Sequence, residues 1–363
     1  MPADERNLKK IDELERRLRS KSGDRDLLFQ LTTLYSDSGQ PLKTAALLES
    51  RLLAGEVDWQ ILETCCEAFR LGIDPARALD LLETQGETFR DGAAFWSLRG
   101  HMLEELGEFE KARLDHEKAL TLDPKDPRFR YRLGVALMKA GRLDEAILAF
   151  DQCVRADPRM TKAQINIGCI HDQNGEPEKA ILAFQKAIEM DPKSVESHFN
   201  LGAAYGDLGR RREAIEEFKK AIEIDPNCAI AHFNLGVIYM EDRPEEAQSA
   251  LRRALAIDPQ NVEIQYYLGR LYLKKGMYDT AIRYLQHCRE KDPDSPRVLY
   301  ELGKAYNSSD MPDHAIEALT RLCELEPRNA DAYFNLGIAL DKKGLYDQAK
   351  HAYREADRLM QRE

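Results

Sequence analysis

The side chains best placed to do chemistry in this chain are asparagines that recur at a fixed interval. Asn166, Asn200 and Asn234 lie 34 residues apart, and each stands two positions before a glycine. A carboxamide offers N–H donors and a carbonyl acceptor together, so one asparagine can bond both the N–H and the C=O of an extended peptide. Asparagines at this spacing would therefore follow a peptide backbone without reading its side chains. The alternative interpretation is that the asparagine belongs to the repeated structural pattern and contacts no ligand.

The sequence argues against catalysis. It contains no glycine-rich phosphate loop, no HExxH pair and no nucleophile elbow, and its eight histidines are scattered. His198 and His232 fall in a slot that holds Trp96 and Tyr333 elsewhere, so we expect them to be packing residues. Paired acids such as Glu216-Glu217 and Glu245-Glu246 fall on outward positions of the predicted second helices, where a solvated face is the default. We expect no enzymatic activity and no cofactor.

The seven cysteines do not have the spacing of a metal site or a disulfide framework. Cys153 and Cys288 stand where other parts of the repeated pattern have alanine, which is typical of small buried side chains. We therefore expect no bound metal, and a reducing compartment fits this usage.

The asparagines belong to a longer repetition that predicts how they are positioned. Glycines recur in steps of 34 residues, with one step of 33, at Gly100, Gly134, Gly168, Gly202, Gly236, Gly269, Gly303 and Gly337. Prolines keep the same interval from Pro124 to Pro327. A period of this length indicates a solenoid of stacked supersecondary units. Eight units result: 93–126, 127–160, 161–194, 195–228, 229–261, 262–295, 296–329 and 330–363.

Within one unit the pattern predicts a helical hairpin. In 127–160, Leu133, Ala136 and Leu137 form an apolar stripe at helical spacing, and Gly141 then permits a turn. A second stripe from Ala146 to Val154 ends before Pro158, because proline disfavours helical geometry at the residue before it. Each hairpin leaves one face unburied until a neighbouring hairpin covers it.

These units resemble the tetratricopeptide repeat family. The family pattern of a large residue, Leu-Gly, a bulky residue, Gly, a bulky residue, Ala, an aromatic and Ala is carried in the last unit by the following residues: Tyr333, Leu336, Gly337, Leu340, Gly344, Tyr346, Ala349, Tyr353 and Ala356. The resemblance covers residues 93–363. It implies an all-α fold, an α-solenoid of helix-turn-helix repeats that forms a superhelix with a concave groove.

The repeat frame continues more faintly towards the amino terminus. Residues 25–58 and 59–92 read as two divergent repeats, together 25–92, with Thr32 and Cys66 in the glycine slot. Residues 1–24 are expected to form a capping helix with Leu8, Ile11, Leu14 and Leu18 on one stripe.

The last repeat also reads as a cap. Lys350 and Asp357 replace apolar residues where a further repeat would pack, and terminal repeats need a polar outer face. This argues mildly against stacking of copies at that end, and the oligomeric state stays open.

The resemblance places specific residues on the inner surface of the superhelix. In this family the first helix of each hairpin lines the concave side through its second, fifth, sixth, ninth, twelfth and thirteenth positions. The fifth position holds Tyr131, Ile165, Phe199, Phe233, Tyr266, Tyr300 and Phe334, and the sixth holds Asn166, Asn200, Asn234 and Asn335. The resulting row of amides resembles the tetratricopeptide superhelix of O-GlcNAc transferase, whose catalytic part is absent from this sequence.

Basic residues fall on the same implied surface. The first candidate patch is Arg128, Arg132, Lys139 and Lys162, and the second is Arg270, Lys274, Arg297 and Lys304. Such patches could select acidic side chains or a carboxyl terminus, although scattered surface charge is an equal alternative.

Two irregularities interrupt the pattern. Unit 229–261 lacks one residue and its mid-repeat glycine, which predicts a tight turn. Unit 262–295 carries Arg289 and Lys291 in slots that are usually apolar, and Asn307 to Asp310 replace a turn glycine in the next unit. We predict either a weaker joint over 289–310 or tolerated drift of a surface.

Charge and hydropathy limit the partners. The formal net charge is −11, which disfavours electrostatic binding to nucleic acid or to an anionic membrane. The amino terminus lacks the apolar core of a signal peptide, and no segment approaches the ~20 apolar residues of a membrane span. We expect a cytoplasmic protein without membrane insertion.

Taken together, the sequence predicts a scaffold that binds a protein partner, with an extended peptide or a partner helix in the concave groove. The alternative is a regulatory or assembly subunit of a larger enzyme or secretion complex. An RNA-binding helical repeat is disfavoured, because such repeats present a basic face with one base-selecting polar code per repeat.

Overall fold

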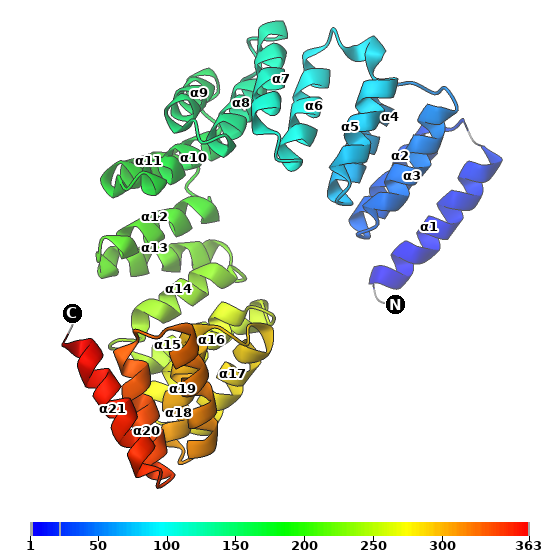
Figure 1. The fold of residues 1–363 in the computed structure, drawn as a ribbon. Helices are drawn as coiled ribbons and strands as arrows, with labels where there is room; N and C mark the ends of the chain where they lie inside the picture. The colour runs from blue at the N-terminus through cyan, green and yellow to red at the C-terminus, as the bar shows by residue number, and fades with distance from the viewer. Residues whose placement is uncertain (1–2, 22, 362–363) are drawn as a thin grey trace. The chain divides into compact units, whose positions relative to one another are not determined.

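The computed structural model describes residues 3–21 and 23–361 of the chain. In these residues it contains α-helices, one turn of 3-10 helix and no strand (Figure 1). Successive helices form hairpins, and we call the two members of a hairpin its first helix and its second helix. The chain divides into two compact units, Met1–Asp191 and Pro192–Glu363, which we describe separately.

The amino-terminal unit, unit 1, contains five hairpins that follow a single helix. Its elements are α1 (Ala3–Ser20), α2 (Arg25–Asp37), α3 (Pro41–Leu53), α4 (Trp59–Leu71), α5 (Pro75–Gln85), η1 (Glu87–Phe89), α6 (Ala93–Glu105), α7 (Phe109–Leu122), α8 (Pro127–Lys139), α9 (Leu143–Ala156), α10 (Thr161–Gln173) and α11 (Pro177–Met190). The hairpins α2–α3 and α4–α5 occupy the two stretches that the sequence predicts as divergent repeats.

The carboxyl-terminal unit, unit 2, also contains five hairpins. Its elements are α12 (Val195–Asp207), α13 (Arg211–Ile224), α14 (Ala229–Tyr239), α15 (Pro244–Ile257), α16 (Val262–Lys274), α17 (Tyr278–Lys291), α18 (Pro296–Ser308), α19 (Pro312–Leu325), α20 (Ala330–Lys342) and α21 (Tyr346–Met360). The first helix α14 has 11 residues against 13 in α16, because the tight turn predicted in 229–261 ends it early.

Except for α14–α15, each hairpin turns through a residue in the left-handed conformation just after its first helix. In α8–α9 this residue is Gly141, with φ of 77°, and the Arg142 N–H donates to Leu137 O at 2.9 Å. This six-to-one hydrogen bond is the Schellman arrangement that satisfies carbonyls at a helix end. In α4–α5 the same position is Ile73, with φ of 64°, so the turn forms there without glycine.

The two helices of a hairpin approach closely at the periodic glycine. A Cβ atom on Gly134 of α8 would lie 2.6 Å from the ring of Phe150 in α9, far inside van der Waals contact. Phe150 is fully buried, with Ala146 and Cys153 beside it in the core of this hairpin. The glycine and proline period is therefore explained by packing and helix ends alone.

The capping helix α1 packs its stripe against the core of the first repeats. Ile11, Leu14 and Leu18 are buried, whereas Leu8 is 53% exposed. The amino-terminal end of the predicted stripe, at Leu8, is therefore not covered. At the other end Lys350 and Asp357 are both exposed.

Apolar packing is continuous across the region where a joint was predicted. Leu285 and Cys288 of α17 share one core cluster with Val298 and Leu302 of α18 and with Leu319 of α19. The packing of residues 289–310 therefore gives no support to a weaker joint there.

All seven cysteines are free, and five of them are buried. Cys153 and Cys288 are buried as predicted, and burial raises the pKa of each thiol to about 11. Within the described residues, no helix is both long and apolar enough to cross a membrane.

Candidate functional site

The predicted asparagines lie on first helices and are partly exposed. Asn166 is on α10 of unit 1, and Asn200, Asn234 and Asn335 are on α12, α14 and α20 of unit 2. The Nδ2 of Asn234 donates to Ile230 O and that of Asn335 to Asp331 O, each at 2.8 Å and one turn back in its own helix. Asn234 keeps its carbonyl oxygen and one N–H for a ligand, whereas the Asn335 amide also hydrogen-bonds Tyr300.

The predicted aromatic residues serve hairpin packing as well as the surface. Rings on first helices contact rings on second helices at centroid distances of 5.7 Å for Tyr131 and Phe150, 6.0 Å for Phe199 and Phe218, and 5.7 Å for Phe334 and Tyr353. Ile165 and Tyr266 at the same slot are buried, and Phe334 is 46% exposed. The row of fifth-position residues is therefore only partly available to a ligand.

Other rings connect neighbouring first helices in unit 2. Phe233 of α14 meets Tyr267 of α16 edge to face at 5.2 Å, and the Arg297 guanidinium of α18 lies 4.5 Å from the Tyr266 ring of α16. Tyr300 is covered by the Lys304 ammonium at 5.0 Å. Aromatic and cationic side chains thus alternate over α16 and α18.

Three of the four cations of the second basic patch are paired with acids inside the chain. Glu301, which is 7% exposed, lies 3.3 Å from Arg270 and 3.1 Å from Lys304. Arg297 pairs with Glu263 on the preceding first helix. These cations therefore hold α16 and α18 together, which reduces what they can offer to an acidic ligand.

Two predicted lysines instead hold the end of the preceding first helix. Lys274 of α16 donates to Met240 O at 2.7 Å and to Glu241 O at 3.0 Å, just beyond α14. Lys342 of α20 donates in the same way to Asn307 O at 2.7 Å, and Lys139 of α8 lies 3.4 Å from Glu104 near the end of α6. A cation at the carboxyl end of a helix satisfies orphan carbonyls and opposes the helix dipole. We call Lys139, Lys274 and Lys342 the lysine clamps.

In unit 1 three consecutive first helices line a small cleft of about 210 Å³. We call it the unit 1 cleft. Its lining residues are Glu63 and Glu67 of α4, Ala94, Ser97, Leu98 and His101 of α6, and Arg128, Phe129 and Arg132 of α8. Two residues of the first predicted basic patch therefore face two acids and a histidine.

Two carboxyl groups in this cleft have opposite pKa shifts. Burial acts to raise the pKa of Glu67, but hydrogen bonds from His101 and Arg70 outweigh it and hold the value at about 2. The pKa of Glu63 is raised by burial and by the neighbouring Glu67 carboxylate. Arg128 hydrogen-bonds Asp126 at 2.9 Å, so it is already engaged beside the cleft.

Sequence reasoning missed Glu63, Glu67, Ser97 and His101. They occupy the fifth and ninth positions of repeats 59–92 and 93–126, which the resemblance places on the inner surface. The same positional rule that selected Tyr131 would have found them.

The histidines in the large-residue slot have a structural role. His198 and His232 each place Nε2 3.2 Å from the carbonyl oxygen of the proline six residues earlier, and Gln265 does the same at 3.0 Å. Trp96 Nε1 donates to Arg90 O at 2.6 Å in the corresponding place. These side chains tie the start of a first helix to the turn before it. His198 Nδ1 also lies 2.6 Å from the carboxylate of Glu217, which is buried, so the expectation of a solvated position was wrong for Glu217.

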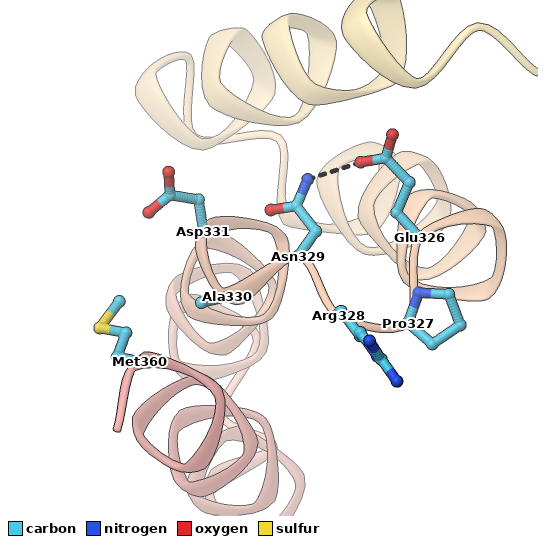
Figure 2. A pocket seen from close by; sticks show the side chains of 7 residues that line it. All are labelled: Glu326, Pro327, Arg328, Asn329, Ala330, Asp331 and Met360. Atoms are coloured by element: carbon cyan, nitrogen blue, oxygen red, sulfur yellow. Dashed lines mark hydrogen bonds between the residues drawn. The ribbon is translucent and has the colours of Figure 1, made fainter. Parts of the chain in front are cut away.

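Figure 2 shows a wider cavity of about 700 Å³ beside the start of α20 and the end of α21. It is lined by Glu326, Pro327, Arg328, Asn329, Ala330, Asp331 and Met360. Asn329 accepts from the Ala332 N–H and donates to Glu326 at 2.8 Å, so its amide caps α20. None of the predicted ligand-contacting residues lies here.

Comparison with protein families gives consistent matches over most of the chain. Models described as tetratricopeptide repeat match residues 98–161, 239–300, 273–324 and 318–351. A model described as TPR repeat matches residues 168–209 and 207–242. No curated protein sequence matches the chain.

Several solved structures share the fold. In the structure of the anaphase-promoting complex heterotetramer Cut9-Hcn1, the likeness covers 99% of this chain and 91% of that chain, with 15% identity and a TM-score of 0.50. The type IV pilus biogenesis factor PilW covers 57% of this chain and 96% of its own, with 22% identity and a TM-score of 0.51. The likeness to PilF of Pseudomonas aeruginosa covers 57% of this chain and 94% of that chain, with 18% identity and a TM-score of 0.52. At these identities the likeness concerns the fold.

Proposed function

Because the chain belongs to the tetratricopeptide repeat family, we propose that it is a scaffold whose first helices bind an extended peptide or a helix of a partner protein. Members of this family act as protein-interaction scaffolds. The surface formed by the first helices within each unit is called the first-helix face below.

The observation that carries the proposal is that two of the predicted asparagines are accessible and have no hydrogen-bond partner for their side chains in the described part of the chain. Asn166 and Asn200 are partly exposed and, within the described residues, make no side-chain hydrogen bond to the protein. Asn200 lies beside the half-buried Phe199 on the same helix. An amide with free donors and acceptor next to apolar surface suits a peptide backbone, because the polar groups of a strand need partners when they leave water.

The second candidate is a regulatory or assembly subunit of a larger complex. The fold likeness to a heterotetramer subunit and to a pilus biogenesis factor is compatible with it, but both identities are below 25% and carry no information about partners. RNA binding stays disfavoured by the net charge of −11. We propose a cytoplasmic setting, in keeping with seven free cysteines.

The test begins with partners that co-purify with the tagged full-length chain from its native host. The chain in which Asn166, Asn200 and Asn234 are all changed to Ala should bind the recovered partner about 100-fold more weakly, at about 1 kcal/mol for each lost hydrogen bond. Its helical circular dichroism should not change. Asn174→Ala, at an exposed helix end, is the matched control. Unchanged affinity in the triple variant would refute the role of the asparagines.

A further inference from the structure

The unit 1 cleft has acids on one side and bases on the other. Glu63 and Glu67 lie one turn apart on α4, and Arg128 and Arg132 lie one turn apart on α8. Ser97 and His101 of α6 lie between them. This order is built into three successive repeats of unit 1, so the two charged sides are positioned by the same packing that forms the stack.

One acid and one base in the cleft have no salt-bridge partner. Glu67 is engaged by Arg70 at 2.8 Å, and Arg128 is engaged by Asp126. Among the described residues, neither Glu63 nor Arg132 forms a salt bridge. Glu63 accepts a hydrogen bond from Trp59 and lies near Arg128, but no cation in the described part of the chain forms a salt bridge with it. The charges without a salt-bridge partner are therefore one carboxylate on α4 and one guanidinium on α8.

A ligand of a single charge would fit this cleft poorly. An anion drawn to Arg132 meets the carboxylates of Glu63 and Glu67, and a cation drawn to Glu63 meets Arg128 and Arg132. A cation next to Glu63 would also relieve the repulsion by Glu67 that raises the pKa of Glu63. Electrostatic complementarity is satisfied when both charges are supplied together.

We propose that the unit 1 cleft is a recognition subsite for a partner segment that carries one basic and one acidic side chain, with the basic group beside Glu63 and the acidic group beside Arg132. This inference rests on the proposed function, because it names the chemistry of the partner at one place on the first-helix face. The cleft of about 210 Å³ has room for about seven water molecules. It therefore accepts the ends of two side chains, while the backbone of the segment lies above it.

The subsite can be tested on the full-length chain with defined synthetic peptides. The probes are fluorescein-labelled Gly/Ser peptides with one Lys and one Glu, in both orders, separated by one to five residues. In matched versions either charged residue is replaced by Gln. Fluorescence anisotropy at low salt should show at least one two-charge peptide that binds about tenfold more tightly than either single-charge version, as expected for about 1.4 kcal/mol.

Substitutions assign each charge of the peptide to one side of the cleft. Glu63→Gln should remove the advantage given by the peptide Lys, and Arg132→Gln should remove the advantage given by the peptide Glu. Glu178→Gln and Lys186→Gln, both exposed on α11, are controls that should leave the preference unchanged. The double variant Glu63→Lys with Arg132→Glu should bind the opposite order of the two peptide charges.

The inference is overturned if no two-charge peptide exceeds its single-charge versions by about threefold, or if the preference survives both cleft substitutions. Circular dichroism of each variant shows whether it has kept its helices. If the asparagine triple variant loses its native partner while the peptides show no two-charge preference, the subsite fails and the scaffold stands. If the two-charge preference is found but the partner binds the asparagine triple variant with unchanged affinity, the proposed role of the asparagines fails and the subsite stands.

Discussion

Burial disfavours the charged form of the Glu67 carboxyl group, but its hydrogen-bonding neighbours favour that form more strongly. Its oxygens accept hydrogen bonds from Arg70 of α4 and face His101 of α6, so the group links two successive first helices. The folded-state pKa is about 2, below the ordinary value of 4.5. A depressed carboxyl pKa contributes stability that is present above the unfolded pKa and is lost as the pH falls through the folded pKa.

The pH dependence of unit 1 should therefore contain a contribution from Glu67. We expect the free energy of unfolding of the wild-type chain to fall by about 1 kcal/mol between about pH 4.5 and pH 2 because of this group. This value is reduced for solvent screening, since the Glu67 side chain is 35% exposed. Glu67→Gln should lower the melting temperature near pH 7 and flatten that part of the profile. The exposed Glu178→Gln is the control, and a Glu67→Gln profile parallel to that of the wild type would contradict the assignment.

The lysine clamps show the limit of positional reasoning about single residues. Lys139 and Lys274 stand at positions that face the inner surface, and the sequence alone does not reveal that their ammonium groups reach the preceding repeat. A flexible lysine side chain is long enough to reach several possible partners. Its partner depends on where the preceding helix ends, which in α14 is two residues earlier than in other first helices.

At the scale of the hairpin, the glycines within helices differ in what an added methyl group would meet. A Cβ on Gly134 would lie 2.6 Å from Phe150, whereas a Cβ on Gly206, within α12, has nothing within 4 Å. Glycine within a helix is less favourable than alanine by roughly 0.5–1 kcal/mol. The same substitution should therefore have opposite effects at these two positions.

We expect Gly134→Ala to destabilise the chain by about 2 kcal/mol through overpacking of the hairpin core. Gly206→Ala should stabilise it by about 0.5–1 kcal/mol. Chemical denaturation followed by circular dichroism measures both. Equal effects of the two variants would show that the α8–α9 contact is looser than the structure indicates.

The hairpins could be predicted from sequence because their rules are local. An apolar stripe at helical spacing, a turn glycine and a closing proline are enough to place a helix pair, as in α8–α9. The hairpin α4–α5 was harder to recognise because Ile73 adopts the left-handed conformation that glycine usually supplies. Its cost, about 1–2 kcal/mol for such a residue, is offset by packing that the sequence does not display.

The candidate site was only partly predictable for a related reason. The positional rule identifies which residues share a face, and it placed Arg128 and Arg132 correctly at the unit 1 cleft. It does not tell which side chains on that face neutralise each other. Glu301 pairs with Arg270 and Lys304 and Glu263 pairs with Arg297, so two carboxylates offset half of the four positive charges of the second predicted patch.

At the scale of the molecule, the core of unit 2 is continuous from α17 to α19. Amide hydrogen exchange should accordingly show similar protection in the helices of 262–329, with no step at 289–310. The helices α12 and α13 of the same unit are the internal reference. Markedly faster exchange confined to 289–310 would restore the weaker joint that the sequence suggested, despite the apolar contacts of Leu285 and Val298.

The lysine clamps have a mechanical consequence. Each joins a residue to one 33 to 35 positions earlier, so three of the junctions between successive hairpins carry polar bonds of similar span in the sequence. Under a stretching force applied at the ends of a unit, such bonds open one after another instead of all together. Each released repeat of 34 residues would then lengthen the tether by roughly 110–120 Å of extended chain. A scaffold built in this way would yield to tension in nearly equal steps while its remaining repeats stay folded.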